Sequence, residues 1–555
     1  MIWEYVLLGN FLETSVIHVR TALQSRAIGI SKSESWRSKD GFGIYSGCKL
    51  EDHFMHRTFS VALLPIIGMI IGCPLHAQIA DSCSRLKDLN IPGAVVEIAK
   101  AENMPAAPAP KVPMGETSGE ILPAHCRVAM VLKPTPDSNI NVELWMPSEK
   151  WNGRFLAVGN GGWAGAIQGY ADMQNALRRG YAAAATDTGH SAVDGPYGMF
   201  ALGHPEKIVD FAYRAVHLMA VHSKRVITAY YSKPPDFSYF KGCSTGGRQG
   251  VMAAQRYPGD FDGIIAGALA NRHIHMHTSA VATTIRLSRN PDQAVSEAKA
   301  KMVHKAVMDQ CDTLKEGFLN NPRLCSFDFS SLLCKRGDGE NCLTPGELFT
   351  VEEYYGGVKN RKGELIFSGQ SLGNAMPAMP STNAAPNAFI WDTVRILGFQ
   401  NPDYDWRGFD LDRDMPRIDA AAGFVDAVNP DLRAYKAHGG KLLLYAGWND
   451  TGIPPENTIL YYESVLREMG GGQQDWMRLF MVPGMGHCSG GSGPYSFDTL
   501  GALEKWREEG IAPDQIIGIN PRSGLTRPLC PFPKYAAYDG TGDLADAVNW
   551  RCVTP

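Results

Sequence analysis

The sequence lacks three features that would assign the protein to a special class. The apolar run from 61 to 72 is too short to span a bilayer, which excludes stable membrane insertion through it. Net charge is -4 and no basic run is present, so nothing indicates a nucleic-acid partner. There is no internal repeat. The 555 residues, 44% hydrophobic and 20% charged, match a globular protein large enough for more than one domain.

The N-terminal segment has the composition of an export signal. Residues 1–54 show no helical or strand periodicity, whereas 55–77 places an apolar run between a basic start and a small-residue cleavage site. We expect translation to start at Met55, with 1–54 a non-native or disordered extension and 55–77 a signal peptide. The alternative is a lipoprotein signal with lipid on Cys73, although Pro74 is an unusual residue to follow a lipidated cysteine. The expected location is secreted or periplasmic.

The cysteines predict disulfide bonds. The chain holds 12 cysteines, and an even number remains after loss of Cys48 and Cys73 with the N-terminal segment. Even numbers at short spacing in an exported chain are typical of disulfides. The alternative, free buried thiols of a cytosolic enzyme, is disfavoured by the export signal. The expected pairs are Cys83 with Cys126, at the ends of a Pro- and Ala-rich arm, Cys311 with Cys325, Cys334 with Cys342, and Cys530 with Cys552.

A glycine-rich turn carries the candidate nucleophile. Gly242-x-Ser244-x-Gly246 lies between a β-prone run at 237–240 and a helix-prone run at 248–257, as the nucleophile-elbow motif requires. The two glycines allow close backbone packing, and the strained turn lifts the serine hydroxyl clear of the sheet. The N–H groups that begin the following helix point at the same place and would stabilise negative charge there. The alternative is an ordinary glycine-rich turn.

A second glycine-rich loop predicts the rest of an oxyanion hole. The short buried strand at 155–158 runs directly into 159–162, Gly-Asn-Gly-Gly, upstream of the nucleophile. This is where the elbow fold class places its second oxyanion donor. We assign one donor to the Gly162 N–H and the other to the Thr245 N–H. The alternative is a plain hairpin or turn.

The acid and base of a catalytic triad are predicted on two late loops. An apolar strand at 441–445 precedes Asp450, and another at 479–482 precedes His487. Together with Ser244 these follow the chain order Ser, Asp, His of the hydrolase fold. We expect the histidine to act as general base and acid, and the aspartate to orient its imidazole. Two nearby acids lack the strand-end position: Asp475 and Glu456.

An earlier Asp and His follow the strand at 181–186. Asp187 and His190 precede the nucleophile, whereas the acid and base of this fold follow it. We therefore interpret both as structural residues that border the cleft.

Two cysteines adjoin members of the predicted triad. Cys243 precedes Ser244 and Cys488 follows His487. If serine and histidine lie within hydrogen-bond reach, their neighbours are close enough for a disulfide. We predict a Cys243–Cys488 bond that holds base and nucleophile in register; the alternative is coincidence.

These patterns predict an α/β-hydrolase fold with a large inserted lid. The catalytic domain is expected over 78–270 and 438–555, and the lid over 271–437, where the strand–helix alternation stops. Aromatic residues of the lid could form the walls of a pocket for a planar substrate or fill the lid's own core. They are Phe389, Trp391, Phe399, Trp406 and Phe409.

The chain resembles the tannase and feruloyl esterase family, which also includes mono(2-hydroxyethyl) terephthalate hydrolase. The similarity runs from about Cys83 to the C-terminus. The resemblance implies a secreted serine esterase with a lid that cleaves esters of phenolic acids such as ferulic or gallic acid. Its motifs are LPAHCRV from Leu122, GNGG from Gly159, GHPEK from Gly203, GCSTGGRQG from Gly242, VPGMGHC from Val482 and RPLCP from Arg527.

The family's calcium loop is altered in this sequence. The lid of the family usually carries an Asp soon after a cysteine, followed by regularly spaced Asp residues. Here Asp312 keeps the first position and Glu316 is a second candidate ligand, but the loop is shortened and carries Lys315 and Asn320 in its acidic part. Since calcium takes six to eight oxygen ligands, we expect weak or absent binding and no required cofactor.

The expected partner is a small aromatic ester, and the sequence does not define the oligomeric state. Gly161 and Thr245 resemble the feruloyl- and tannin-cleaving members, which favours phenolic esters. A terephthalate monoester is the alternative, and its free carboxylate would need a lid cation. Another alternative is a catalytically silent phenolic- or carbohydrate-binding protein, which the retention of all three triad positions disfavours. The lid arginines available are Arg395, Arg407, Arg413 and Arg417.

Overall fold

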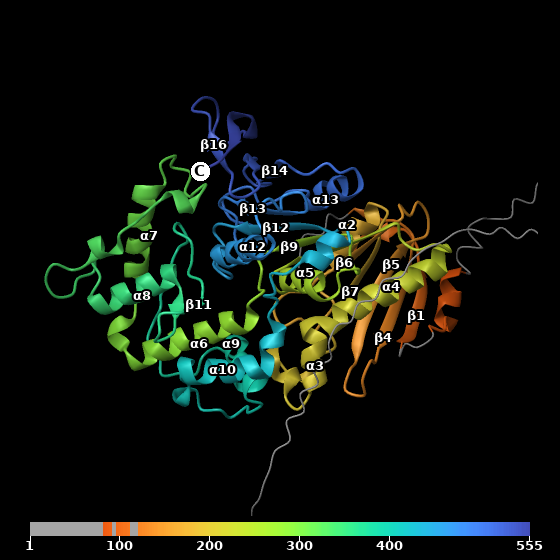
Figure 1. Ribbon diagram of the computed structural model, residues 1–555, viewed down its shortest axis with the longest axis horizontal. Helices are drawn as coiled ribbons and strands as arrows, with labels where there is room; N and C mark the ends of the chain where they lie inside the picture. Colours follow the sequence, from red (N-terminus) through yellow and green to blue (C-terminus); the bar gives the residue numbers. More distant parts are fainter. Residues whose placement is uncertain (1–81, 92–95, 112–119) are drawn as a thin grey trace, which may run out of the picture. The chain divides into compact units, whose positions relative to one another are not determined.

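The computed structural model describes residues 82–91, 96–111 and 120–555. The predicted extension 1–54 and signal peptide 55–77, with Met55 and Cys73, lie outside the described residues. The described residues build a nine-stranded sheet in the order β1-β4-β5-β7-β6-β8-β9-β12-β13 (Figure 1). Its strands are β1 (Val96–Met104), β4 (His125–Leu132), β5 (Ile140–Pro147), β6 (Arg154–Val158), β7 (Ala182–Thr186), β8 (Phe237–Cys243), β9 (Gly263–Gly267), β12 (Lys441–Gly447) and β13 (Met477–Val482).

The sheet is antiparallel from β1 to β7 and parallel from β7 through β6 and β8 to β13. Parallel strands need crossover connections, so helices cover both faces. They are α2 (Tyr170–Arg178), α4 (Ala215–Tyr231), α5 (Thr245–Arg256), α12 (Pro455–Met469) and α13 (Thr499–Glu508). This architecture confirms the α/β-hydrolase fold that the sequence predicts.

Alternate residues of each central strand enter two different cores. Phe155 and Ala157 of β6 join the core under α4, α5 and α12, whereas Leu156 and Val158 join the core under α2 and α13. Side chains of a strand point to opposite faces, so strands covered on both sides must be apolar throughout. That is why these strands appear in the sequence as short apolar runs without alternation.

The Pro- and Ala-rich arm contributes a strand that the sequence analysis did not predict. Val96–Met104 forms β1, which pairs antiparallel with β4 at the edge of the sheet. Among its residues only Ile98 is buried, so the strand has no hydrophobic alternation to detect. Two short strands, β2 (Ala107–Pro108) and β3 (Ile121–Leu122), pair beyond it.

The chain between β9 and β12 forms a group of helices, drawn green to teal in Figure 1. They are α6 (His273–Arg289), α7 (Glu297–Cys311), α8 (Pro345–Gly356), α9 (Ala388–Asp392), α10 (Leu411–Ala422) and α11 (Arg433–Ala437), with a small hairpin of β10 (Val358–Lys359) and β11 (Leu365–Phe367). The sequence analysis predicts a lid over this stretch, and we call this insertion the lid. No helix among the described residues has the length and apolar content needed to cross a membrane.

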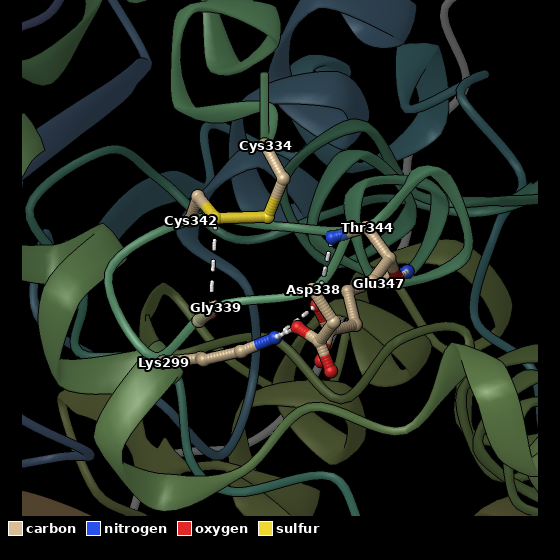
Figure 2. The surroundings of a disulfide bond; sticks show 7 residues. All are labelled: Lys299, Cys334, Asp338, Gly339, Cys342, Thr344 and Glu347. Carbon is tan, nitrogen blue, oxygen red and sulfur yellow. Dashed lines mark hydrogen bonds and ion pairs between the residues drawn. A yellow bond between two sulfur atoms is a disulfide. The ribbon is translucent and has the colours of Figure 1, made fainter. Parts of the chain in front are cut away.

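One part of the lid is held by a buried lysine beside a disulfide (Figure 2). The Lys299 ammonium on α7 lies 2.6 Å from Asp338 and 2.7 Å from Glu347 at the start of α8. Glu347 also accepts the Thr344 N–H, and its own N–H donates to the Thr344 hydroxyl, which completes a capping box. The lysine thereby joins two lid helices that a small apolar core packs together.

The remaining elements lie near the C-terminus and before the elbow. α3 (Pro205–Val209) continues through a π-helical stretch, Asp210–Arg214, into α4. Two C-terminal hairpins pair β14 (Ile516–Ile519) with β15 (Thr526–Leu529) and β16 (Tyr535–Tyr538) with β17 (Trp550–Val553).

Candidate active site

Ser244 stands on a sharp turn between β8 and α5. Its backbone has φ +64° and ψ −123°, a strained conformation for a residue with a side chain. A Cβ on Gly242 would lie 2.6 Å from the Gly246 backbone, and one on Gly246 would lie 3.0 Å from the Asn160 carbonyl oxygen. These positions therefore require glycine, and the turn has the geometry of a nucleophile elbow.

Asp450 and His487 meet at the carboxyl ends of β12 and β13. The His487 Nδ1 lies 2.7 Å from Asp450 Oδ2. The other carboxylate oxygen of Asp450 accepts the backbone N–H groups of Gly452 and Ile453 at 2.8 and 2.9 Å. The aspartate side chain is fully buried and the histidine side chain is 37% exposed. With Nδ1–H donating to the carboxylate, Nε2 is left as a proton acceptor on the open side.

A disulfide couples the histidine loop to the elbow. Cys243 and Cys488 are bonded, with their Cα atoms 5.9 Å apart. No hydrogen bond joins Ser244 to His487 in the described chain, a separation that is common before substrate binds. The structure contains the same five disulfides that the sequence analysis expects: Cys243–Cys488, Cys83–Cys126, Cys311–Cys325, Cys334–Cys342 and Cys530–Cys552.

The two expected oxyanion donors lie beside each other. The Thr245 hydroxyl donates to the Gly162 carbonyl at 2.6 Å, which ties the two segments together. Gly162 has φ +54°, a conformation that glycine adopts without strain. Neither the Gly162 nor the Thr245 backbone N–H finds an acceptor among the described residues. Both donors are available to a negatively charged oxygen.

Three further side chains orient the oxyanion loop, and the sequence analysis did not assign this role to them. Gln249 accepts the Asn160 N–H at 3.0 Å, and Gln168 accepts the Gly161 N–H at 2.7 Å. His190 Nε2 lies 2.7 Å from the Trp163 carbonyl. Gln249 falls inside the GCSTGGRQG motif, so the sequence held a signal for it; the other two become visible only through their contacts.

Asp187 and His190 are both buried near this loop. The sequence analysis interprets them as structural residues. Asp187 accepts two bonds from Asn141, at 2.9 and 2.6 Å, and burial raises its pKa to about 6. His190 stacks on Phe200 with ring centroids 3.7 Å apart. Burial lowers the pKa of His190 to about 4, so the imidazole is neutral at pH 7.

The lid aromatics divide between the two roles left open by the sequence. Trp391, Trp406 and Phe409 are buried in an apolar core that the lid shares with residues before the elbow, and Phe399 packs against it. Phe389 is 36% exposed, and its ring lies 3.6 Å from the position of a Cβ on Gly162. Phe389 therefore presents an aromatic face beside one oxyanion donor.

The four lid arginines all lie close to aspartates of the lid. The nearest carboxylates are Asp392 for Arg395 at 2.8 Å, Asp405 for Arg407 at 3.5 Å, and Asp414 for both Arg413 and Arg417, at 2.7 and 3.8 Å. The two other acids that the sequence analysis weighed pair with other side chains, Glu456 with Arg323 and Asp475 with Lys436.

The residues of the shortened lid loop do not fit a calcium ion. Both Asp312 oxygens accept backbone N–H groups, from Glu316 and Gly317. Glu316 pairs at 2.7 Å with Arg527, whose side chain is fully buried and also donates to Asn320. A guanidinium already neutralises this carboxylate and would repel a second cation.

The fold and the arrangement of the site place this protein in the class of α/β-hydrolases. The sequence profile of the tannase and feruloyl esterase family matches residues 126–553, and the chain belongs to this family. It is 37% identical over 551 residues to an uncharacterized esterase from Xanthomonas campestris, covering 88% of this chain and 94% of that protein. It is 32% identical over 529 residues to a probable feruloyl esterase B-2 from Aspergillus fumigatus, covering 89% and 99%.

Solved structures agree with this assignment. Feruloyl esterase B from Aspergillus oryzae superposes with a TM-score of 0.76 at 29% identity, covering 86% of this chain and all of that one. Tannin acyl hydrolase from Aspergillus niger has a TM-score of 0.71 at 20% identity, covering 86% and 96%, and shows the shared fold. The protein is a carboxylic ester hydrolase of the feruloyl esterase and tannase type.

Removal of the Cys243–Cys488 bond by a double Cys→Ser change is expected to lower both stability and turnover. The bond closes a sequence separation of 245 residues; the chain-entropy model assigns such a bond ~5 kcal/mol. The matched control is the double Cys→Ser change at Cys334 and Cys342, separated by 8 residues in the lid. Thermal unfolding and ester hydrolysis measure the effects. Equal activity of the two double variants would contradict a role in aligning the site.

Neutral His190 makes stability depend on pH. Its folded-state pKa of about 4 is below the unfolded value of 6.5, so the unfolded chain takes up the proton first. The contribution of neutral His190 to the free energy of unfolding is fully present above pH 6.5. It is lost as the pH falls towards 4, by about 3 kcal/mol at most. His190→Gln should flatten the curve of unfolding free energy in this window, measured by urea denaturation. The surface substitution His438→Gln is the control, and an unchanged slope in His190→Gln would refute the assignment.

Calcium is expected to leave thermal stability unchanged. Because Arg527 supplies the cation at Glu316, neither added calcium nor a chelator should move the unfolding temperature. Glu316→Gln leaves the buried Arg527 guanidinium without its carboxylate and should lower the free energy of unfolding by about 3–5 kcal/mol. Asp309→Asn breaks the exposed pair with Lys305 on the same lid and serves as control. A calcium-dependent rise in unfolding temperature that a chelator reverses would show that the site binds the ion.

Proposed function

We propose that the protein is a secreted serine esterase that cleaves esters of phenolic acids through Ser244, His487 and Asp450. The observation that carries the proposal is the coupling of an elbow serine at φ +64° to a buried acid–histidine pair by the Cys243–Cys488 disulfide. A strained serine, a histidine with a fixed tautomer and a buried carboxylate that orients it are the parts that acyl transfer needs.

In the proposed mechanism His487 Nε2 takes the proton of the Ser244 hydroxyl as its oxygen attacks the ester carbonyl. The N–H groups of Gly162 and Thr245 stabilise the tetrahedral oxyanion, each donor contributing about 3 kcal/mol in comparable sites. The imidazolium, paired with Asp450, then gives its proton to the departing alcohol. Water then attacks the acyl carbon while His487 takes its proton. The bond to Ser244 breaks, the serine oxygen regains a proton from His487, and the acid is released.

An aromatic acyl group is supported by Phe389. Its partly exposed ring lies next to Gly162 and offers a flat apolar face. In the proposed mechanism the aromatic ring of the acyl group would pack on this face. The names of the related proteins point to feruloyl esters and tannins. A feruloyl or galloyl ring carries no charge at pH 7, because its phenol groups keep their protons, so an apolar face suffices to hold it.

A terephthalate monoester remains the second candidate, favoured only by the number of lid arginines. Each arginine lies near a lid aspartate. The free carboxylate of the substrate would therefore have to displace that aspartate or share the arginine with it. The alternative of a silent binding protein is disfavoured by the free oxyanion donors, which a binding protein has no reason to keep.

Export is the proposed cellular route. Five disulfides are typical of oxidising compartments, and they support secretion or a periplasmic location, with lipid attachment at Cys73 as the alternative. We place the catalytic domain at 78–270 and 438–555 and the lid at 271–437. No cofactor is required in this proposal.

The test is hydrolysis of methyl ferulate, methyl gallate and the monohydroxyethyl ester of terephthalic acid by protein expressed from Met55. Turnover should be highest on a phenolic ester. Ser244→Ala should lower kcat by about 10⁴-fold or more while leaving the fold intact, since the nucleophile is lost and the oxyanion hole remains.

Labelling with a fluorophosphonate probe distinguishes a wrong substrate class from a wrong nucleophile if the hydrolysis test is negative. Labelling of Ser244 without turnover on any of the three esters would refute the substrate class and leave the triad standing. Absence of labelling in a folded protein would refute the catalytic role of Ser244 and favour the binding-protein alternative.

A further inference from the structure

A cavity of about 520 Å³ lies between the lid and the C-terminal hairpin of β16 and β17. One wall comes from residues between 310 and 326, at the end of α7 and in the loop after it, and the other comes from β16 and Trp550. Figure 1 draws β16, in blue, beside the green segment that follows α7. None of the described residues that line this C-terminal cavity belongs to the candidate triad or the oxyanion loop. Its volume is that of a site for a small molecule or a short oligomer.

Covalent and ionic links hold the two walls in place. The Cys311–Cys325 bond closes the lid wall, and the Cys530–Cys552 bond fastens the hairpin. The Arg527–Glu316 pair, at 2.7 Å, joins the lid loop to the C-terminal segment. The cavity is therefore formed before a ligand arrives, and binding would cost little ordering of the protein.

Aromatic side chains give the hairpin wall an apolar face. Tyr535 and Tyr538 are partly buried there, and the Tyr538 ring centroid lies 5.4 Å from that of Trp550. The Tyr535 hydroxyl forms no hydrogen bond within the part of the chain that the structure describes. A tyrosine so placed offers a flat ring for the C–H face of a sugar and a polar tip for one of the sugar hydroxyls.

Two amides of the lid wall each keep one polar group free. The Asn321 carbonyl oxygen accepts the Arg323 N–H at 3.2 Å, and its NH₂ group finds no acceptor among the described residues. Gln310 donates to the Ser326 carbonyl at 2.7 Å, and its own carbonyl oxygen accepts no bond from the same set of residues. Together with the Tyr535 hydroxyl, these groups offer a donor and acceptors with which the hydroxyls of a neutral ligand can pair.

The charge of the cavity disfavours an anion. Asp312 is the one charged residue type among the described lining residues. Its two carboxylate oxygens accept the backbone N–H groups of Glu316 and Gly317, at 3.2 and 2.8 Å. An anionic ligand would lose water here and meet a carboxylate instead of a cation, whereas a neutral hydroxylated ligand would not.

We propose that the C-terminal cavity is a binding site for a neutral oligosaccharide, separate from the site of ester hydrolysis. The rings of Tyr535 and Tyr538 stack on the apolar faces of the sugar, and the amides of Asn321 and Gln310 bind its hydroxyls. The site cleaves no bond and does not depend on Ser244. Because the protein is an ester hydrolase, such binding would raise the effective concentration of esters carried by the same carbohydrate chain.

Calorimetric titration of the protein expressed from Met55 with xylotetraose and cellotetraose, two neutral oligosaccharides, tests the site. At least one of them should bind with a Kd of about 1 mM or tighter, the range expected for a few hydrogen bonds and stacked rings. Tetragalacturonate, whose sugar units carry carboxylates, should bind at least about tenfold more weakly. Ser244→Ala should bind the neutral sugar as the wild type does, so a failure of the proposed catalytic mechanism would leave this result unchanged.

Two substitutions locate the bound sugar. Asn321→Asp removes the free NH₂ group, adds negative charge and keeps the oxygen that accepts the Arg323 N–H, so it should raise Kd for the neutral sugar about tenfold. Asn429→Asp is the matched control, because Asn429 is exposed, lies outside the cavity lining and accepts the Asp431 N–H in the same way, at 3.1 Å. Tyr535→Ala should raise Kd about tenfold, whereas Tyr535→Phe, which retains the ring, should raise it about threefold.

Thermal unfolding shows which variants are folded, and Asn321→Asp carries the test if loss of the Tyr535 ring unfolds the hairpin. Binding that neither Asn321→Asp nor Tyr535→Ala weakens would place the sugar at another site and overturn the proposal. Absence of binding of both neutral sugars by the wild type would overturn it as well. Equal or tighter binding of tetragalacturonate would overturn the selection of a neutral ligand.

Discussion

The strained backbone of Ser244 is the constraint on which the rest of the site depends. A φ of +64° is costly for serine and persists only where the surroundings enforce it. Gly246 lets the turn approach the oxyanion loop, because a Cβ there would lie 3.0 Å from the Asn160 carbonyl oxygen. The buried Arg248 fixes the helix that follows. Its guanidinium donates to the Ala212, Phe211 and Val425 carbonyls, so a fully buried cation ties the elbow to the end of the lid.

The same packing couples the lid to the oxyanion hole. Trp163, next to Gly162, belongs to one apolar cluster with Trp391 and Ile396 of the lid, and its indole N–H donates to the Phe389 carbonyl at 2.8 Å. A shift of the lid would therefore move the loop that carries an oxyanion donor. In the proposed mechanism, substrate recognition by the lid and stabilisation of the transition state would share one set of contacts, which is how distant binding energy can assist the reacting centre.

Three buried cations among the described residues have close polar partners. Arg248 faces three carbonyl oxygens, Lys299 faces two carboxylates between lid helices, and Arg527 faces Glu316 while its guanidinium lies 3.4 Å from the centre of the Trp550 ring. Removing either partner of the Arg527–Glu316 pair would leave an unpaired charge in a poorly solvated place, so this pair acts as a fixed joint. The lid loop and the C-terminal hairpin are joined in this way, in the place where the family pattern leads one to expect a metal ion.

Local patterns in the sequence determined the elbow, the central strands, the order of the candidate triad and the cysteine pairs. Each depends on backbone geometry or spacing that a short stretch encodes: glycine around Ser244, apolar runs for strands buried on both faces. The tertiary structure alone decided that Phe389 leaves the lid core while Trp391 enters it, and that the exposed strand β1 completes the sheet. It also paired Arg527 with Glu316, 211 residues away. These outcomes depend on which distant surfaces meet, and no local periodicity records that.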